Sequence, residues 1–364
     1  MANCLAAVIT AFNQPLELRR LPFPELEPDS ALIKVDAATL CGTDAHRWLG
    51  HMAEHTPFIP GHETTGTIVE LRGELFGALH EPLRVGDRVI ASYPFCGSCY
   101  YCTVARQPTL CPSGISFGHQ PADQPPYLLG GCAEYHYFPP RSGFVRVPDE
   151  VSAPLAASAA CALRTVVHGF EQLGAIASHE TVLIQGAGPL GLYSVAMARD
   201  HGARQVLVIG APKARLEVAK SWGADAVLDL DECPEVKQRR AWALDHSAGR
   251  GPDIVIQCAA ASAVGEGLEI LRPGGRYVSI GIGGPPSVPI STNIFRKQVQ
   301  IKTVFMAEQR HFYEALQFLA TRRQHFPFDK IISGTYTLDR TTDALRAMAE
   351  FREVKPLILP QLAA

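Results

Sequence analysis

Short apolar runs separated by turn residues characterise the first part of the chain. Residues 31–35, 66–69 and 87–91 form such runs, and glycine, proline or aspartate separates them. Short strands between turn signals are typical of a mainly β structure. The pattern therefore predicts a mostly β domain from the start of the chain to about residue 155.

After Leu155 the pattern changes, and alanine- and leucine-rich helical stretches alternate with fully apolar runs. The runs expected to form buried strands are 181–184, 205–209, 253–256 and 276–280. Strands separated by segments of helix length imply right-handed βαβ units and a parallel sheet. The alternation ends near residue 300, and the apolar spacing of 311–321 and 342–351 predicts amphipathic surface helices.

Composition excludes several classes of protein. Of the 364 residues, 47% are hydrophobic and 19% charged, and this length predicts about two domains. The 33 Lys and Arg residues against 36 Asp and Glu give a formal charge of -3, so we expect no nucleic-acid or membrane partner. No apolar run reaches the roughly 18 residues of a membrane span, and no basic region precedes an apolar one at the N-terminus. We therefore expect a cytoplasmic protein.

Four of the ten cysteines lie in one short segment, at Cys96, Cys99, Cys102 and Cys111. In a reducing compartment clustered thiols bind metal more often than they form disulfides. Two successive spacings of this kind with a fourth thiol nearby suit a closed tetrahedral Zn²⁺ site, which is structural because no position is left for water. An iron–sulfur cluster and four free cysteines that meet by chance are the alternatives.

A G-x-G-x-x-G motif directly follows the first buried apolar run. Gly186 permits a tight turn, Gly188 lets the backbone approach a pyrophosphate, and Gly191 lets the helix pack against the strand. Pro189 and Leu190 complete the motif, which opens an alanine-rich helix whose N-terminus would face the phosphates. Because strand, turn, helix and the later βαβ units agree, the motif predicts a dinucleotide site rather than a chance glycine-rich turn.

The next apolar run lacks the acidic residue that usually holds the adenosine ribose hydroxyls of NAD. It ends at Ile209 and Gly210 and is followed by Lys213 and Arg215. No carboxylate is then present to repel a 2′-phosphate, so the cofactor is expected to be NAD(P)(H), with a weak lean towards NADP(H). The alternative is that both cations are solvated helix residues.

A dispersed set of residues has the composition of a catalytic zinc site. Cys41 lies in C-G-T-D-A-H, His62 in G-H-E-T-T-G, and Cys161 in an alanine-rich stretch far downstream. Two thiolates and one imidazole leave a fourth position for water or substrate. Taken singly, a histidine beside Glu63 is more often a satisfied polar pair, and Cys161 is more often a core residue.

In this combination the chain resembles the zinc-dependent medium-chain dehydrogenases/reductases, which include alcohol, sorbitol and threonine dehydrogenases. The motifs in order are C-G-T-D-x-H, G-H-E-x-x-G, V-G-D-R-V at 85–89, the cysteine segment, Cys161 and the glycine motif. The resemblance implies an α/β fold with two domains. A GroES-like, mostly β catalytic domain is expected over 1–162 and 305–364, and a Rossmann domain with a doubly wound parallel sheet over 163–304.

The resemblance also implies roles for individual residues. Cys41, His62 and Cys161 are expected to bind a catalytic zinc ion. Glu63 is expected to lie nearby or to serve as an alternate ligand. The four-cysteine segment is expected to hold a second, structural zinc ion, and the assembly to be a homodimer or homotetramer.

The expected reaction is reversible hydride transfer between a small alcohol, secondary or polyol-like, and NAD(P)⁺. The alcohol proton is expected to pass through Thr43 to His46 and solvent, although an ordinary surface histidine is the alternative for His46. Two rival functions stay open. One is a biosynthetic NADPH-dependent reductase of a carbonyl or iminium group, and the other is a nucleotide-binding protein without catalysis.

Some features depart from the resemblance. Gly42 stands where some relatives carry an arginine for the cofactor phosphates, which makes Lys355 the candidate for that charge. Residues 70–84 and 112–131 are predicted to form long loops. Candidate substrate contacts from nearby loops, each equally suited to packing, are Trp48, His51, Phe58 and Phe117.

Overall fold

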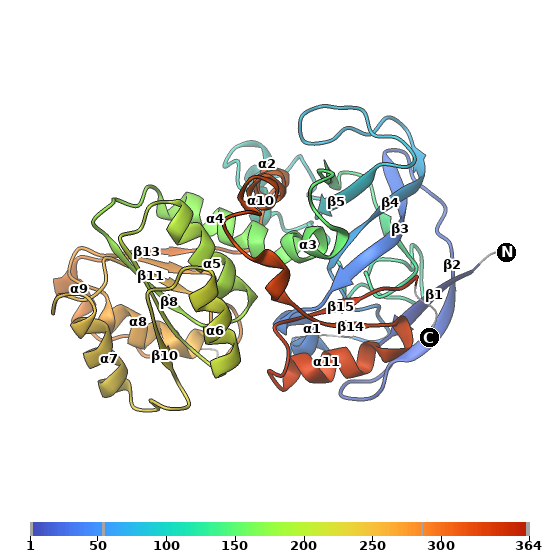
Figure 1. The fold of residues 1–364 in the computed structure, drawn as a ribbon. Coiled ribbons are helices and arrows are strands. Elements are labelled where there is room, and N and C mark those ends of the chain that lie inside the picture. Colours follow the sequence, from blue (N-terminus) through green and yellow to red (C-terminus); the bar gives the residue numbers. More distant parts are fainter. Residues whose placement is uncertain (1–2, 53–54, 285–286, 362–364) are drawn as a thin grey trace. The chain divides into compact units, whose positions relative to one another are not determined.

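The computed structural model describes residues 3–52, 55–284 and 287–361, which form two compact units (Figure 1). The first unit comprises Met1–Arg164, Met306–Arg322 and Ile332–Ala364, and the second comprises Thr165–Phe305 and Arg323–Ile331. The return of Arg323–Ile331 to the second unit is not visible in the sequence pattern. Within that unit Phe328 packs edge-to-face on Trp222, with ring centroids 5.4 Å apart, which explains the return.

The first unit is built on a seven-stranded sheet with the spatial order β14-β15-β3-β4-β5-β7, in which β6 also pairs with β3. Its strands are β3 (Ser30–Thr39), β4 (Glu63–Arg72), β5 (Arg88–Ser92), β6 (Tyr135–Phe138), β7 (Gly143–Arg146), β14 (Ile332–Tyr336) and β15 (Lys355–Ile358). A separate antiparallel pair joins β1 (Asn3–Val8) to β2 (Glu17–Pro22). The three apolar runs predicted as strands lie in β3, β4 and β5, so those predictions are confirmed.

The helices of the first unit are α1 (Gly42–Trp48), α2 (Tyr100–Thr103), α3 (Ala153–Ser158), α10 (Gln309–Arg322) and α11 (Thr341–Ala349). The two amphipathic helices predicted near the C-terminus are α10 and α11. In α10 the buried residues Phe312, Leu316 and Leu319 recur at helical spacing, and this apolar face is what the sequence pattern detected. The stretch 112–131 contains no helix or strand among the described residues, as predicted.

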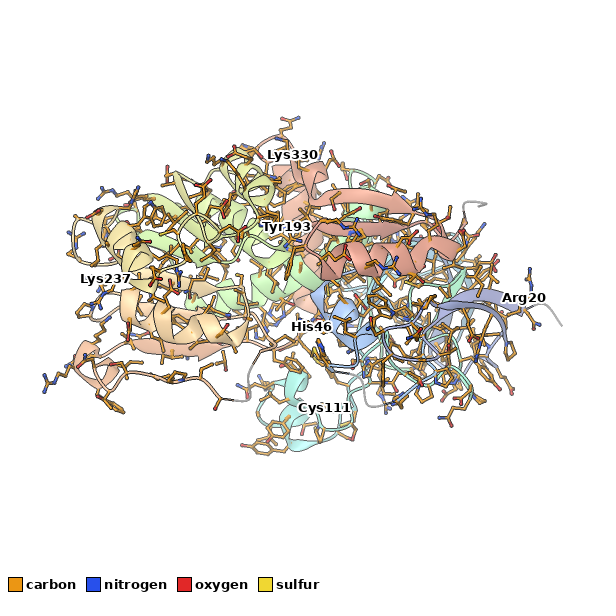
Figure 2. The ribbon with its side chains drawn as sticks, turned by 90° about the horizontal axis from the view of Figure 1, so that it is seen from below. Arg20, His46, Cys111, Tyr193, Lys237 and Lys330 are labelled. Carbon is orange, nitrogen blue, oxygen red and sulfur yellow. The ribbon has the colours of Figure 1, made fainter. Side chains whose placement is uncertain are left out.

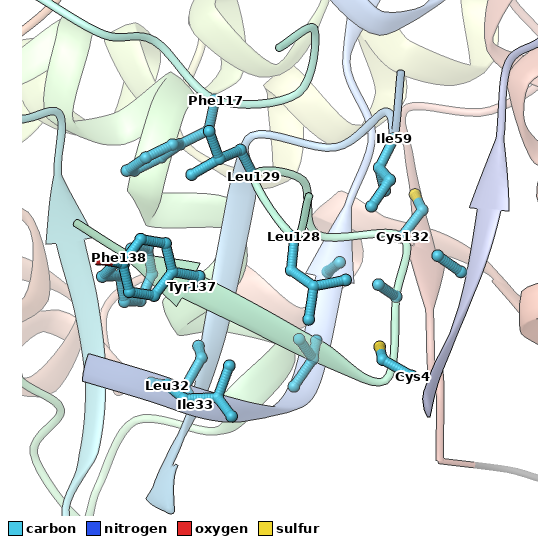
Figure 3. Close-up of a cluster of buried hydrophobic side chains, with 14 of the residues drawn as sticks. Cys4, Leu32, Ile33, Ile59, Phe117, Leu128, Leu129, Cys132, Tyr137 and Phe138 are labelled. Atoms are coloured by element: carbon cyan, nitrogen blue, oxygen red, sulfur yellow. The ribbon is translucent and has the colours of Figure 1, made fainter. Parts of the chain in front are cut away.

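The core of the first unit includes side chains from β1, β3, β6 and the long loop before β6 (Figure 3). Ile33, Leu128 and Tyr137 are fully buried there. Phe117 lies edge-to-face against Tyr93, with ring centroids 5.2 Å apart. The long loop therefore packs inward and supports the sheet, although its backbone is irregular.

The four side chains predicted as candidate substrate contacts differ in burial. Phe58 and Phe117 are fully buried core residues, so packing is the role that the structure gives them. Trp48 is also buried, and its indole N–H donates to the Gln14 carbonyl at 2.8 Å. His51 alone of the four is exposed.

The second unit is a six-stranded parallel sheet with the order β10-β9-β8-β11-β12-β13 (Figure 1). Its strands are β8 (Thr181–Gln185), β9 (Gln205–Gly210), β10 (Ala226–Asp229), β11 (Ile254–Gln257), β12 (Arg276–Ser279) and β13 (Gln300–Thr303). The helices are α4 (Arg164–Leu173), which begins at the last residue of the first unit, α5 (Pro189–Asp200), α6 (Lys213–Ser221), α7 (Val236–Asp245), α8 (Val264–Ile270) and α9 (Ile294–Lys297). The four predicted strands and the doubly wound topology are confirmed.

The strand order of this sheet reverses between β8 and β11. From β8 the chain proceeds outward to β9 and β10, and then returns to place β11 on the other side of β8. In open α/β sheets ligands bind at such a switch point, at the carboxyl ends of the strands. The glycine motif follows β8 directly and therefore lies at this position.

Among the residues that the structure describes, no helix is long and apolar enough to cross a membrane.

Candidate active site and metal centres

The residues expected to bind catalytic zinc come together in the first unit. Ligand atoms of Cys41, His62, Glu63 and Cys161 all lie within 4.8 Å of one another. Cys41 immediately precedes α1, and the His62–Glu63 pair stands at the start of β4. Cys161 lies in the π-helical turn Ala159–Leu163 between α3 and α4. We call these four residues the buried cluster.

A fully buried aspartate orients the histidine of this cluster. His62 Nε2 lies 3.5 Å from Cys41 Sγ and 3.4 Å from Cys161 Sγ, while Nδ1 lies 3.1 Å from Asp44 Oδ1. Asp44 also accepts hydrogen bonds from the backbone N–H groups of Cys41 and Gly61. An Nδ1–H donated to the carboxylate leaves the Nε2 lone pair towards the two sulfurs, which is the usual arrangement around a metal-binding histidine.

The electrostatics of this pair favour the charged form of both partners. Although burial disfavours the carboxylate, the charges of His62 and Arg47 hold the pKa of Asp44 far below its ordinary value. Burial likewise disfavours the imidazolium, but the nearby charges of Asp44, Tyr93 and Cys41 raise the pKa of His62 well above its ordinary value. Asp44 is therefore an anion that fixes the ring. Sequence reasoning missed this role, although Asp44 belongs to the C-G-T-D motif.

The two thiols of the buried cluster differ in acidity. A hydrogen bond between Cys41 and Cys161, followed by burial, raises the pKa of Cys41. The same hydrogen bond lowers the pKa of Cys161, and the positive charges of Arg164 and Lys355 act in the same direction. The surroundings thus favour a thiolate at Cys161.

Glu63 is held from one side by two donors. The Lys355 ammonium and the Thr39 hydroxyl both donate to Glu63 Oε2. Oε1 is buried and has no hydrogen-bond partner among the described residues. Lys355 is itself fully buried in this ion pair, so its charge is matched within its own unit, and its contact with the cofactor pyrophosphate stays a prediction. Strand β15 places its ammonium beside a carboxylate of its own unit.

The two residues expected to relay a proton both lie in α1. Thr43 is half-buried in the first turn, and His46 is exposed near the end of the helix (Figure 2). His46 Nδ1 lies 3.3 Å from Nδ1 of His51, and burial together with the charge of His51 lowers the pKa of His46. In the part of the chain that the structure describes, no hydrogen bond joins Thr43 to His46.

The four clustered cysteines form a second centre, which we call the cysteine lobe (residues 96–111). The four sulfur atoms lie within 4.8 Å of one another. The backbone N–H of Cys99 donates to Cys96 Sγ at 3.3 Å, and that of Cys96 donates to Cys111 Sγ at 3.4 Å. Hydrogen bonds from the backbone at Ser98 and Cys99 lower the pKa of Cys96 to about 6. Figure 2 marks Cys111 in this lobe.

Both centres have donor sets that suit zinc. Four sulfurs, of which those of Cys96 and Cys111 accept amide N–H groups, match a closed tetrahedral site. Two sulfurs and an imidazole whose other nitrogen is tied to a carboxylate match a site with a fourth position free. The residues present therefore fit the metal in both places.

The glycine motif has the local geometry of a dinucleotide loop. Gly186 adopts φ +110° and donates its N–H to the Ile209 carbonyl at 2.7 Å. A Cβ atom at Gly191 would collide with the Gly186 carbonyl oxygen, and one at Gly210 with Ala187. Gly188 is the N-cap of α5, and Pro189 and Leu190 open that helix. Glycine is therefore required at Gly191 and Gly210, because neighbouring backbone atoms lie too close for a side chain.

The two cations after β9 have different surroundings. Lys213 is exposed and lies 3.5 Å from Glu232. Arg215 is buried, and desolvation lowers its pKa. Its guanidinium is about 4.0 Å from the position that a Cβ on Gly188 would take. Arg215 therefore lies beside the glycine loop, whereas Lys213 is exposed at the start of α6, and its contact with the cofactor stays a prediction.

Two such sets of metal ligands, together with a doubly wound nucleotide-binding fold, are typical of a zinc-dependent, nicotinamide-linked oxidoreductase. Comparison with known proteins agrees. The family model for the alcohol dehydrogenase GroES-like domain matches residues 27–149, and that for zinc-binding dehydrogenase matches residues 189–321. The chain therefore belongs to the zinc-dependent medium-chain dehydrogenase/reductase family.

Individual relatives cover nearly the whole chain. The 5-exo-hydroxycamphor dehydrogenase of Pseudomonas putida is 31% identical over 98% of this chain and 99% of its own length. The crystal structure of an alcohol dehydrogenase from Thermotoga maritima has a TM-score of 0.92 and 31% identity, covering 99% of this chain and 100% of the other. A structure from Sinorhizobium meliloti, assigned as a zinc-binding dehydrogenase and bound to NADP, has a TM-score of 0.83 and 27% identity, covering 99% and 100%.

Proposed function

We propose that this chain catalyses reversible hydride transfer between a small secondary or polyol-like alcohol and NAD(P)⁺, with Cys41, His62 and Cys161 as the ligands of a catalytic zinc ion. The observation that carries the proposal is the convergence of two sulfurs and one oriented imidazole nitrogen in one buried cluster. A catalytically silent nucleotide-binding protein would have no reason to keep this set with its supporting aspartate.

The residues of the site divide the work between them. A zinc ion held by the cluster would act as a Lewis acid that lowers the pKa of an alcohol near it. Asp44 keeps the His62 ring in one tautomer and orientation. Thr39 and Lys355 both donate to one carboxylate oxygen of Glu63. The other oxygen remains available, so Glu63 can lie near the metal or serve as an alternate ligand.

The proton of the alcohol is proposed to leave through α1. The Thr43 hydroxyl can accept one proton while it donates another, and His46 lies one turn further on at the surface. The contact between His46 and His51 gives the proton a second imidazole on its way to solvent. The lowered pKa of His46 favours the neutral form that accepts a proton.

The cysteine lobe is proposed to hold a structural zinc ion, which makes two zinc ions per chain. Its four sulfurs leave no position for a substrate, and its amide-to-sulfur hydrogen bonds favour thiolates. The lobe is the most local of the sites, since all of its ligands come from residues 96–111.

The dinucleotide is proposed to bind at the switch point, over the glycine loop and the N-terminus of α5. Gly186, Gly188 and Gly191 let the pyrophosphate approach the backbone, with Gly210 at the end of β9. The buried Arg215 beside Gly188 supports the lean towards NADP(H), because a guanidinium suits a 2′-phosphate. The relative from Sinorhizobium meliloti was solved with NADP.

A homodimer or homotetramer is proposed from the exposed edge of the second unit. All four residues of β13, the last strand of the sheet, are exposed, and Phe295 and Ile301 present apolar side chains nearby. An unprotected edge strand of this kind is a template for pairing with another chain. Sedimentation equilibrium would test this.

Metal analysis joined to activity tests the central proposal. Purified protein should contain two zinc ions per chain and oxidise members of a panel of primary, secondary and polyhydric alcohols with NAD⁺ or NADP⁺. The Cys41→Ser variant should lose one zinc ion and its turnover. Cys233→Ser, which alters a cysteine outside both centres, is the matched control. Unchanged turnover in a zinc-depleted Cys41→Ser protein would overturn the proposal.

A further inference from the structure

Arg164 is a buried cation without a carboxylate partner. It is 3% exposed, and no ion pair to it forms among the described residues. Its Nε donates to the Ala160 carbonyl at 2.8 Å, and the guanidinium carbon lies 5.3 Å from the Tyr93 ring centroid and 5.0 Å from that of Phe312. The terminal nitrogen Nη1 is buried and has no hydrogen-bond partner within the described chain. Burying an unpaired charge is costly, so a compensating negative charge is expected close by.

The buried cluster supplies that negative charge. Arg164 begins α4 three residues after Cys161, and its charge acts on that thiol. The titratable and charged groups that face the cluster come from five segments, and they are Asp44 with Arg47, Glu63, Tyr93, Arg164 and Lys355. Asp44 and Glu63 are the carboxylates among them, and Lys355 is a fully buried second cation.

Counted without the half-buried Arg47, these charges balance when a divalent ion is added. Cysteine ligands bind metal as thiolates, so two thiolates and two carboxylates bring four negative charges. Arg164 and Lys355 bring two positive charges, and a divalent cation supplies the remaining two. On that count, the site would keep a net negative charge without either side chain.

We propose that Arg164 and Lys355 are the counter-charges of the buried cluster, and that Arg164 thereby sets the acidity of the substrate alcohol at the site without touching it. The inference rests on the proposed function. Arg164 would act on the substrate through its charge alone, which makes it a positioning residue and not a catalytic one. A positive charge near the site favours the anionic form of the alcohol, and the aromatic rings of Tyr93 and Phe312 hold the guanidinium in place.

The test compares Arg164→Met, which removes the charge, with Arg164→Lys, which keeps it. In the zinc enzyme the acidic limb of the kcat profile should move to higher pH by about one unit in Arg164→Met, since the alcohol loses a favourable charge. Arg164→Lys should restore most of that shift. A side chain with only a packing role would lower the melting temperature without this difference between the two variants.

A spectroscopic readout does not depend on turnover. With Co²⁺ in place of the catalytic zinc, loss of a positive charge beside Cys161 raises the energy of the thiolate electrons. The sulfur-to-metal charge-transfer band should therefore move to longer wavelength in Arg164→Met and stay near the original position in Arg164→Lys. Lys355→Met should move the band in the same direction, which keeps the test available if one variant does not fold.

The matched control is Arg239→Met. Arg239 is a buried arginine of the second unit that pairs with Glu266 at 2.7 Å, so its removal reports the general effect of losing a buried guanidinium. It should leave both the band and the pH profile in place. A wild-type protein that binds no cobalt at the Cys41 cluster would contradict the proposed function. Normal cobalt binding with an unmoved band in both Arg164→Met and Lys355→Met would overturn the counter-charge inference alone.

Discussion

The two sulfur-rich centres of the first unit are built in opposite ways. The cysteine lobe draws its four ligands from sixteen consecutive residues, and backbone N–H groups direct themselves at its sulfurs. The buried cluster draws its ligands from three distant segments, and ionised side chains surround it. This contrast indicates that a short loop can organise a closed site. An open site instead needs the whole fold to place its ligands and to balance their charge.

The largest expected effect separates the two centres by function. His62→Ala removes the only nitrogen of the buried cluster and should lower kcat/KM at least about 1,000-fold, since the Lewis acid would be lost. The cysteine lobe is built independently, so one zinc ion per chain should remain. Steady-state kinetics and metal analysis on the same preparation check both points.

Retention of full activity would contradict this prediction. Loss of both zinc ions would instead show that the two centres fold as one, and the comparison between them would fail.

The next effect tests how the buried cluster is supported. Asp44→Asn keeps the shape of the side chain but removes the charge that orients His62. Loss of such a supporting carboxylate typically costs about 10- to 100-fold in metal affinity. Competition with a chelator should therefore show weaker zinc at the buried cluster only. Equal affinity in Asp44→Asn and the wild type would mean that the fold alone fixes the histidine ring.

A third prediction concerns the core that holds the buried cluster in place. His136 on β6 is fully buried, and neither ring nitrogen has a hydrogen-bond partner among the described residues. Burial lowers its pKa from 6.5 to about 3. The unfolded chain therefore takes up a proton below pH 6.5 that the folded chain refuses until about pH 3, so stability falls as the pH falls through this window.

The direction of this pH dependence of stability can be tested by substitution. His136→Leu should remove up to about 1.4 kcal/mol of destabilisation per pH unit in the acidic part of this window, seen as a flatter plot of unfolding free energy against pH. The exposed His179→Leu serves as the control and should leave the slope unchanged. An identical slope in His136→Leu and the wild type would contradict the account of this residue.

The sequence was most informative where a pattern is local or repeated. The glycine motif, the cysteine lobe and the strands β8, β9, β11 and β12 all follow from spacing or from continuous apolar runs. Strands β10 and β13 were missed because they lie at the two edges of the sheet. Their residues are only partly buried in β10 and exposed in β13, so neither presents an apolar run.

The supporting residues of the buried cluster could not be predicted for a different reason. Lys355 reaches Glu63 because β15 pairs with β3 across more than 300 residues, with Leu357 opposite Thr39. Arg164 stands close to Cys161 in the sequence, but its significance lies in what it lacks, which is a carboxylate partner. Such relations exist only once the core has brought the segments together.

The smallest expected effect returns to the cysteine lobe. The Ser98 hydroxyl lies 3.7 Å from Cys96 Sγ. It is a side-chain hydrogen bond to a metal ligand, as is the contact of Asp44 with His62 in the buried cluster. Ser98→Ala should change zinc retention by no more than about twofold, because an exposed, long contact to sulfur contributes little beside the two amide hydrogen bonds of the loop. Chelator competition beside Asp44→Asn measures the contrast. A tenfold loss in Ser98→Ala would mean that side chains organise both centres, and the distinction between a loop-built and a fold-built site would no longer hold.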